Sequence, residues 1–230
     1  TARRAKFIYI NYPNNPTGAV ATKAFYEKLV AWAKTYEVGV VSDLAYGALG
    51  YQGYENPSFL STPGAKDVGI EFYTFSKTFN MAGWRLAFAA GNEQMIEALN
   101  LIQDHLFVGI FPALQEAGIA ALSDPKSEEA VAQLNATYDS RRDAFVQAAA
   151  KIGWQAFPSR GSFYAWMPVP EGYTSESFAD LLLEKAHVAV APGKGFGLAG
   201  DAYVRIGLLV EPERLVEAVD RIANLHLFNN

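Results

Sequence analysis

The segment IEFYTFSKTFNMAGWR, residues 70–85, places a lysine directly after an apolar run. Residues 70–75 are rich in β-branched and aromatic side chains, which predicts a largely buried strand with Lys77 emerging at its end. Ligands of open α/β sheets bind at such strand ends. Most lysines are solvated surface charges, but in a partly dry crevice near other cations a neutral amine can attack a carbonyl and form a Schiff base. Lys77 is therefore a candidate nucleophile.

The residues before this segment predict a parallel sheet. A strand, a turn-rich loop, a helix capped by Thr22 and a second strand follow one another, which is a βαβ unit. A loop is expected over 52–66, where glycine and proline are frequent. The elements that we expect in this part are strands at 7–11, 38–43, 70–75 and 85–90 and helices at 23–36 and 92–103.

The second half of the chain predicts linking helices and then a smaller α+β lobe. The helices are expected at 112–122 and from about 125 to 152, and the pattern changes from Trp154 onward. In the lobe we expect strands at 154–157, 162–167, 188–191 and 203–208, a helix near 175–186 and a last helix from Pro212. The sequence thus indicates an α/β fold with two domains, residues 1–140 and residues 141–230.

Composition and charge exclude several classes of function. The 230 residues carry 19 basic and 24 acidic side chains without a basic tract, so we expect no nucleic-acid partner. No apolar stretch is long enough for a membrane span, so we expect no membrane association. There is no cysteine, which is compatible with the cytoplasmic location that we expect. The three histidines show no metal-ligand spacing, so no metal site is expected.

Polar side chains gather at the expected strand ends and the loops that follow. Each residue alone is weak evidence for a functional site, because an acid after a strand or an Asn-Pro-Thr-Gly turn is common. The candidates are Asn15, Asp43, Tyr46, Thr74, Ser76, Lys77, Arg85 and Arg205.

Four segments in this order resemble the fold-type I aminotransferases that use pyridoxal 5'-phosphate (PLP), in the aspartate aminotransferase superfamily. They are NNPTG (14–18), SDLAY (42–46), SKTFNMAGWR (76–85) and YVRIG (203–207). The resemblance runs through essentially the whole chain. It implies the C-terminal part of a PLP-transferase fold, with a mostly parallel sheet, flanking helices and a small α+β C-terminal lobe.

The resemblance also implies a role for each candidate. Lys77 would form the Schiff base with PLP and then move the proton of the substrate α-carbon. Asp43 would keep the pyridine nitrogen protonated, and Asn15 and Tyr46 would donate to the phenolic oxygen.

The remaining candidates match anion-binding positions of the family. Thr74, Ser76 and Arg85 would bind the cofactor phosphate, for which hydroxyls and a guanidinium are suited. Arg205, assisted by Asn15, would bind the substrate α-carboxylate.

One glycine-rich segment lies outside these motifs. Residues 193–197, GKGFG, could be mistaken for a nucleotide loop, but the order and context of such a loop are missing. We interpret it as a turn-forming loop.

The expected activity is transfer of an amino group between an amino acid and a 2-oxo acid. Residues 106–112 carry no arginine for a distal carboxylate, so an apolar or thioether amino acid is favoured over aspartate. Two alternatives stay open: a PLP-dependent C–S lyase of the same fold, and a PLP-binding regulatory domain.

Family members carry a long segment before the NNPTG motif, whereas this chain begins just before it. We therefore expect an N-terminally truncated member: either another chain supplies the missing part of the site, or this chain is inactive by itself. In the whole protein we expect a homodimer, because the family builds each active site from two subunits.

Overall fold

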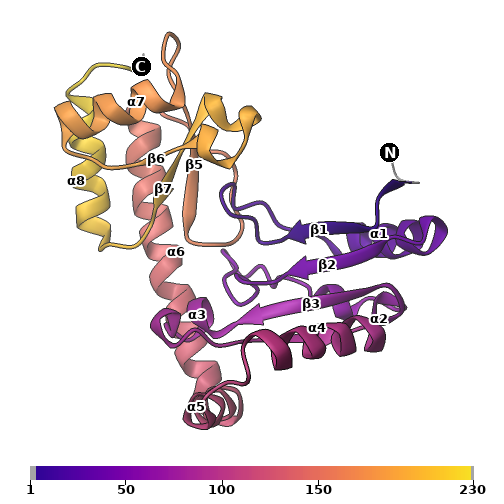
Figure 1. Cartoon of the computed structure of the whole chain (residues 1–230). Coiled ribbons are helices and arrows are strands. Elements are labelled where there is room, and N and C mark those ends of the chain that lie inside the picture. Colours follow the sequence, from indigo (N-terminus) through magenta and orange to yellow (C-terminus); the bar gives the residue numbers. More distant parts are fainter. Residues whose placement is uncertain (1–3, 229–230) are drawn as a thin grey trace. The chain divides into compact units, whose positions relative to one another are not determined.

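A four-stranded sheet carries the polar strand ends of the first half. The structure, a computed structural model, describes residues 4–228. The strands are β1 (Phe7–Asn11), β2 (Gly39–Asp43), β3 (Gly69–Thr74) and β4 (Ala87–Gly91), in the order β1-β2-β3-β4 (Figure 1). The first three are parallel, and β4 is antiparallel to β3. The expected, mostly parallel sheet is confirmed.

Helices cover this sheet because its strands are apolar on both faces. Helix α1 (Lys23–Tyr36) begins at Thr22, whose hydroxyl accepts a hydrogen bond from the Phe25 amide at 3.1 Å. Its buried side chains pack with Ile10 and Val40, whereas the alternate residues of β1 point to the other face, along which α4 runs. The other helices of this part are α2 (Ala65–Val68), α3 (Phe75–Thr78), α4 (Glu93–Leu106) and α5 (Pro112–Ser123).

A buried carboxylate fastens the loop after β2 to the sheet. Glu71 in β3 is only 5% exposed, and it accepts hydrogen bonds from Ser42 of β2 at 3.0 Å and from the Phe59 amide at 2.8 Å. The Ser58 hydroxyl donates a third. One side chain thus joins two parallel strands and the short 3-10 helix Phe59–Ser61.

The second half forms a small antiparallel sheet with its own core. Strands β5 (Tyr164–Pro168), β7 (Tyr203–Gly207) and β6 (Ala191–Pro192) lie in the order β5-β7-β6. Its core includes Phe145, Trp154 and Met167. The helices are α6 (Ser127–Lys151), α7 (Ser175–Leu181) continued by a π-helical turn over Leu182–Ala186, α8 (Pro212–Ala223), and short 3-10 helices at Gly193–Phe196 and Leu198–Ala202.

Two short segments of the first half belong to the compact unit formed by the second. Within residues 4–228, one unit holds 4–13, Val20–Gly50 and Glu55–Leu134, and the other holds Asn14–Ala19, Tyr51–Tyr54 and 135–228. The Tyr51 hydroxyl donates to the Ser162 carbonyl oxygen, and the Arg160 amide donates to the Gly18 carbonyl oxygen at 3.1 Å. The domain assignment of 1–140 and 141–230 stays a prediction.

Two expected strands are wrong. Residues 154–157 form no strand, because the Trp154 amide donates to the Ala149 carbonyl oxygen at the end of α6. Of these residues, only Phe157 bonds to β5 through its amide, at 2.9 Å. At 188–191 the strand is reduced to Ala191–Pro192, because the Val188 amide bonds back to Leu182. The apolar periodicity was present in both places, but helix ends had taken the backbone donors.

The strand expected at 70–75 ends at Thr74, and the one expected at 85–90 begins at Ala87. Thr74 is the N-cap of α3 and its hydroxyl accepts from the Ser76 amide at 3.2 Å, which turns Phe75 into the helix. Arg85 has φ 54° and therefore cannot continue a strand.

Glu71→Ala should destabilise the protein by about 3 kcal/mol, because three donors lose their acceptor and two of them lie in the core. Glu71→Gln keeps one acceptor oxygen and should cost less. Urea unfolding followed by circular dichroism measures both. The matched control is Glu27→Ala, at an exposed position of α1. A Glu71→Ala protein as stable as this control would contradict the role of Glu71 in joining the strands and the loop.

Candidate active site

Lys77 lies in the single turn of α3 that follows β3. The turn is fixed at its start by Thr74 and near its end by Thr78, whose hydroxyl lies 2.6 Å from that of Tyr73. Burial raises the pKa of Tyr73, although its hydrogen bond to Thr78 opposes this effect. The Lys77 ammonium group is half-buried and lies 6.0 Å from the ring centroid of Tyr46, which is itself buried. The structure thus brings together two of the predicted residues, Lys77 and Tyr46.

Asp43 ends β2 at the same edge of the sheet at which β3 ends. In the parallel register it pairs with Asn11 of β1 and Phe72 of β3. Its side chain is exposed and accepts a hydrogen bond from the Ala45 amide at 3.0 Å. Asn11 donates to its carbonyl oxygen at 3.1 Å. A carboxylate held in this way can accept a further donor from a ligand above the strand ends.

The three predicted phosphate-binding residues are only partly assembled. The hydroxyl oxygens of Thr74 and Ser76 lie 3.0 Å apart. The guanidinium of Arg85 is exposed and donates to the Ala82 carbonyl oxygen at 2.9 Å. The structure therefore brings the two hydroxyls together and directs the arginine to the backbone of its own loop.

Arg205 and Asn15 meet in the second unit. Arg205 lies in β7, and its Nη1 donates to Oδ1 of Asn15 at 2.7 Å. The loop that carries Asn15 is held by Asn14, whose side-chain oxygen accepts from the amide and the hydroxyl of Thr17. The structure thus joins the two residues predicted to bind a carboxylate.

Two aromatic rings beside Arg205 were missed from the sequence. The guanidinium carbon lies 4.1 Å from the ring centroid of Tyr164 and 4.7 Å from that of Phe196. Tyr164 could have been found, since β5 pairs with β7 and residues two apart on a strand share a face. Phe196 lies in the glycine-rich loop, where no periodicity indicates direction.

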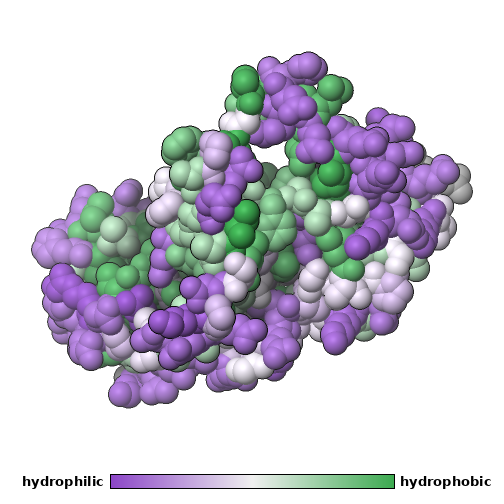
Figure 2. Space-filling view, turned by 90° about the horizontal axis from the view of Figure 1, so that it is seen from below, coloured by the Kyte–Doolittle hydropathy of each residue, from purple (hydrophilic) through white to green (hydrophobic). Residues whose placement is uncertain are grey.

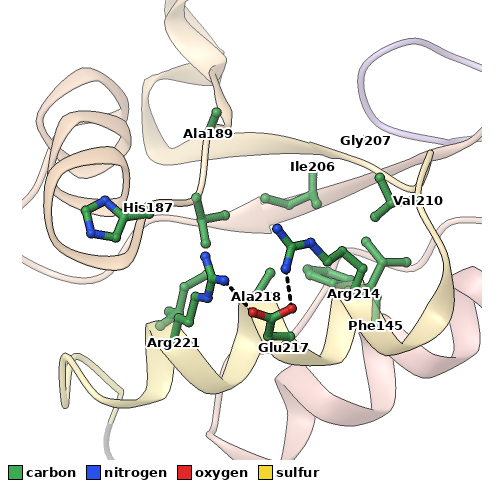
Figure 3. A pocket seen from close by; sticks show the side chains of 13 residues that line it. Phe145, His187, Ala189, Ile206, Gly207, Val210, Arg214, Glu217, Ala218 and Arg221 are labelled. Carbon is green, nitrogen blue, oxygen red and sulfur yellow. Dashed lines mark hydrogen bonds and ion pairs between the residues drawn. The ribbon is translucent and has the colours of Figure 1, made fainter.

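A cavity elsewhere in the second unit contains none of the predicted residues (Figure 3). It measures about 220 Å³ and lies between α8, β7 and the segment after His187. Glu217 lies between Arg214 and Arg221, and their hydrogen bonds hold the pKa of this carboxyl below its usual range. The charged groups of this cavity thus bind one another.

Residues 4–228 hold neither a metal-ligand cluster nor a membrane-spanning helix. This part of the chain has no cluster of three or more His, Asp or Glu side chains that could hold a metal ion. None of its helices is both long enough and apolar enough to cross a membrane.

Comparison with known proteins agrees with the motifs. The family model for aminotransferase class I and II matches residues 1–222. The L-glutamine–4-(methylsulfanyl)-2-oxobutanoate aminotransferase of Bacillus subtilis is 58% identical over 225 residues, covering 98% of this chain and 56% of that protein. The LL-diaminopimelate aminotransferase of Moorella thermoacetica is 49% identical over 221 residues, covering 96% of this chain and 56% of that protein.

A solved structure shows the same fold. Substrate-bound BacF from Bacillus subtilis superposes with a TM-score of 0.93 at 48% identity, covering 98% of this chain and 57% of that one. The chain spans about half the length of the curated relatives that it matches.

Members of the matched family use PLP, and the residues described here fit that cofactor. A half-buried lysine suits an aldehyde, a carboxylate at the neighbouring strand end suits a protonated ring nitrogen, and two adjacent hydroxyls suit a phosphate. Because the family match spans nearly the whole chain and these residues carry its motifs, this chain belongs to the aminotransferase class I and II family.

Proposed function

We propose that this chain is part of a PLP-dependent aminotransferase that moves an amino group between an amino acid and a 2-oxo acid. The observation that carries the proposal is the placement of Lys77 on the turn after β3, beside Tyr46 and at the same sheet edge as Asp43. This edge is where ligands of open α/β sheets bind.

When bound, PLP supplies an electron-withdrawing ring that stabilises a carbanion at the substrate α-carbon. The Lys77 amine would hold the cofactor aldehyde and, when free, would carry the proton of the substrate α-carbon. The Asp43 carboxylate would keep the ring nitrogen protonated. Tyr46 and Asn15 would donate to the phenolic oxygen.

Anion binding falls to the remaining predicted residues. Thr74 and Ser76 offer hydroxyl donors to the cofactor phosphate, and Arg85 offers a guanidinium that uses one donor on the Ala82 carbonyl oxygen. Arg205 binds the substrate α-carboxylate. Its bond to Asn15 uses one of five N–H donors, so enough donors remain for a two-point contact with a carboxylate.

Borohydride reduction of the complete protein with PLP should place the pyridoxyl group on the peptide that contains Lys77. Peptide mapping by mass spectrometry reads this directly. Lys77→Ala should lose the label and lower turnover by at least about a thousandfold, because no amine remains to move the proton.

One control variant and one further site variant sharpen this test. Lys28→Ala, at an exposed position of α1, should keep both label and turnover. Asp43→Asn should keep the label on Lys77 but slow turnover, since the ring nitrogen loses its carboxylate. A label on another lysine would overturn the assignment of Lys77.

We further propose a thioether amino acid as substrate. Residues 106–112 carry no arginine, and Leu106, Phe107 and Val108 are apolar and exposed. The relative from B. subtilis, by its name, pairs L-glutamine with 4-(methylsulfanyl)-2-oxobutanoate. The diaminopimelate aminotransferases among the relatives make that diamino dicarboxylic acid the alternative.

With 4-(methylsulfanyl)-2-oxobutanoate as acceptor, glutamine should be converted and methionine should form. We expect kcat/KM at least about tenfold higher for methionine than for aspartate in the reverse direction, because a second carboxylate meets no arginine and must be desolvated. Chromatography of the amino acids measures both. Faster turnover of LL-diaminopimelate would overturn the thioether assignment, and pyruvate and ammonia formed from a cysteine thioether without any added oxo acid would indicate the lyase.

We propose that the protein is a homodimer. Helices α4 and α5 and the loop between them expose many large apolar side chains, and Figure 2 shows hydrophobic residues at the surface on the face seen from below. These exposed side chains are Leu101, Ile102, Leu106, Phe107, Val108, Ile110, Phe111, Ile119 and Leu122. The cytoplasmic location stays a prediction.

Light scattering of the complete protein should therefore give a dimer. Ile119→Glu combined with Leu122→Glu should shift it toward the monomer, because two charges are buried without partners. Leu183→Glu, at an exposed position after α7, is the control and should stay dimeric. A monomer before any substitution would contradict the proposal.

A further inference from the structure

The glycine-rich segment 193–197 is more than a turn, because its backbone approaches that of Gly200 so closely that neither Gly193 nor Gly200 has room for a Cβ. A Cβ on Gly193 would lie 2.2 Å from the Gly200 carbonyl oxygen, and one on Gly200 would lie 2.1 Å from the Gly193 carbonyl oxygen. The two backbones therefore touch. Gly197 has φ 128°, which other residues rarely adopt. These constraints fix the path of the loop on both sides of Phe196.

Side chains at the start of α7 fasten the same loop. Ser175 is fully buried, and its hydroxyl accepts from the Lys194 amide at 3.2 Å and donates to Asp201 at 2.8 Å. The Lys194 ammonium group lies 2.6 Å from the Glu176 carboxylate. The hydrogen bonds from Ser175 hold the pKa of Asp201 below its usual range, so this carboxylate acceptor persists to lower pH than an ordinary aspartate. The loop is thus held at several points around Phe196.

The fixed loop presents one aromatic ring to Arg205. The Phe196 centroid lies 4.7 Å from the guanidinium carbon, and its ring meets that of Trp166 edge-on at 6.0 Å. Tyr164 lies over the same guanidinium. Among residues 4–228, Arg205 has no ion pair with a carboxylate, and its hydrogen-bonding side-chain partner is the amide of Asn15.

We propose that Phe196 is a positioning residue for binding of the α-carboxylate of the amino acid and of the 2-oxo acid, acting through Arg205. This inference rests on the proposed role of Arg205 in substrate binding. An aromatic face attracts a guanidinium without using any of its N–H donors. The rings therefore restrict the guanidinium while its N–H edge stays available to the carboxylate.

The alternative is that Phe196 only fills space next to Trp166. Its side chain is 41% exposed, so it buries less than a core residue would. A space-filling role is also met by leucine, which has a similar shape and no aromatic face. Leucine and tyrosine at position 196 therefore separate the two roles.

The experiment compares an acid with its neutral amide in the complete protein with PLP bound. Calorimetry gives the Kd of 4-(methylsulfanyl)butanoate and of 4-(methylsulfanyl)butanamide. Phe196→Leu should raise the Kd of the acid about tenfold and leave the Kd of the amide unchanged. Phe196→Tyr should bind the acid as the wild type does. Kinetically, Phe196→Leu should raise KM for the amino acid and the 2-oxo acid by a similar factor, with a smaller change in kcat.

Phe157→Leu is the matched control, since Phe157 is 43% exposed in the same unit, and it should bind the acid as the wild type does. Thermal unfolding checks that each variant is folded, and Phe196→Met replaces the leucine variant if that one is not. Wild-type binding of the acid by Phe196→Leu, or equal weakening of acid and amide, would overturn the inference.

Arg205→Lys distinguishes failure of the inference from failure of the proposed function. If Arg205→Lys weakens binding of the acid and Phe196→Leu does not, only the role proposed for Phe196 is wrong. If Arg205→Lys also binds the acid normally, Arg205 does not bind the carboxylate and both proposals fall.

Discussion

The parallel pairing of β2 with β3 is the constraint on which the candidate site depends. In this register Asp43 lies opposite Phe72, so the last residue of β2 and the turn that carries Lys77 share one edge of the sheet. Glu71 holds the pairing from within, because its carboxylate accepts from Ser42 on the neighbouring strand. A shift of one residue would turn the side chains of β3 to opposite faces and remove this bond. The candidate site at the edge of the sheet thus depends on the hydrogen bond between Ser42 and Glu71 in the core.

The sequence predicted most of this unit because its signals are local. Thr22 marks the start of α1, and the apolar runs before Asp43 and Thr74 are typical of buried parallel strands. No local signal of this kind predicted the direction of strand β4. The chain reaches β4 through α3 and the 3-10 helix Ala82–Trp84, and it runs antiparallel to β3 after Arg85, whose positive φ cannot be inferred from an arginine.

Prediction was weaker where partners distant in sequence decide the outcome. Residues 154–157 have the composition of a strand, but the Trp154 amide bonds back to α6 and its indole donates to the Pro168 carbonyl oxygen at 2.7 Å. The pairing of Asn15 with Arg205 spans 190 positions and was expected only through the family resemblance. Phe196 carried no signal, because its place depends on the contact between Gly193 and Gly200.

Within residues 4–228, several arginines of the second unit bind carboxylates and Arg205 does not, and this difference bears on function. Arg141, Arg214 and Arg221 bind carboxylates, which satisfy their charge and would compete with any anionic ligand. Arg205 instead has aromatic faces and a neutral amide around it. Desolvating a cation without an anion costs free energy, which is recovered only when a carboxylate arrives. Rings can hold a guanidinium in place at little cost to its donors, so the surroundings of Arg205 are those expected of a cation kept for an external anion.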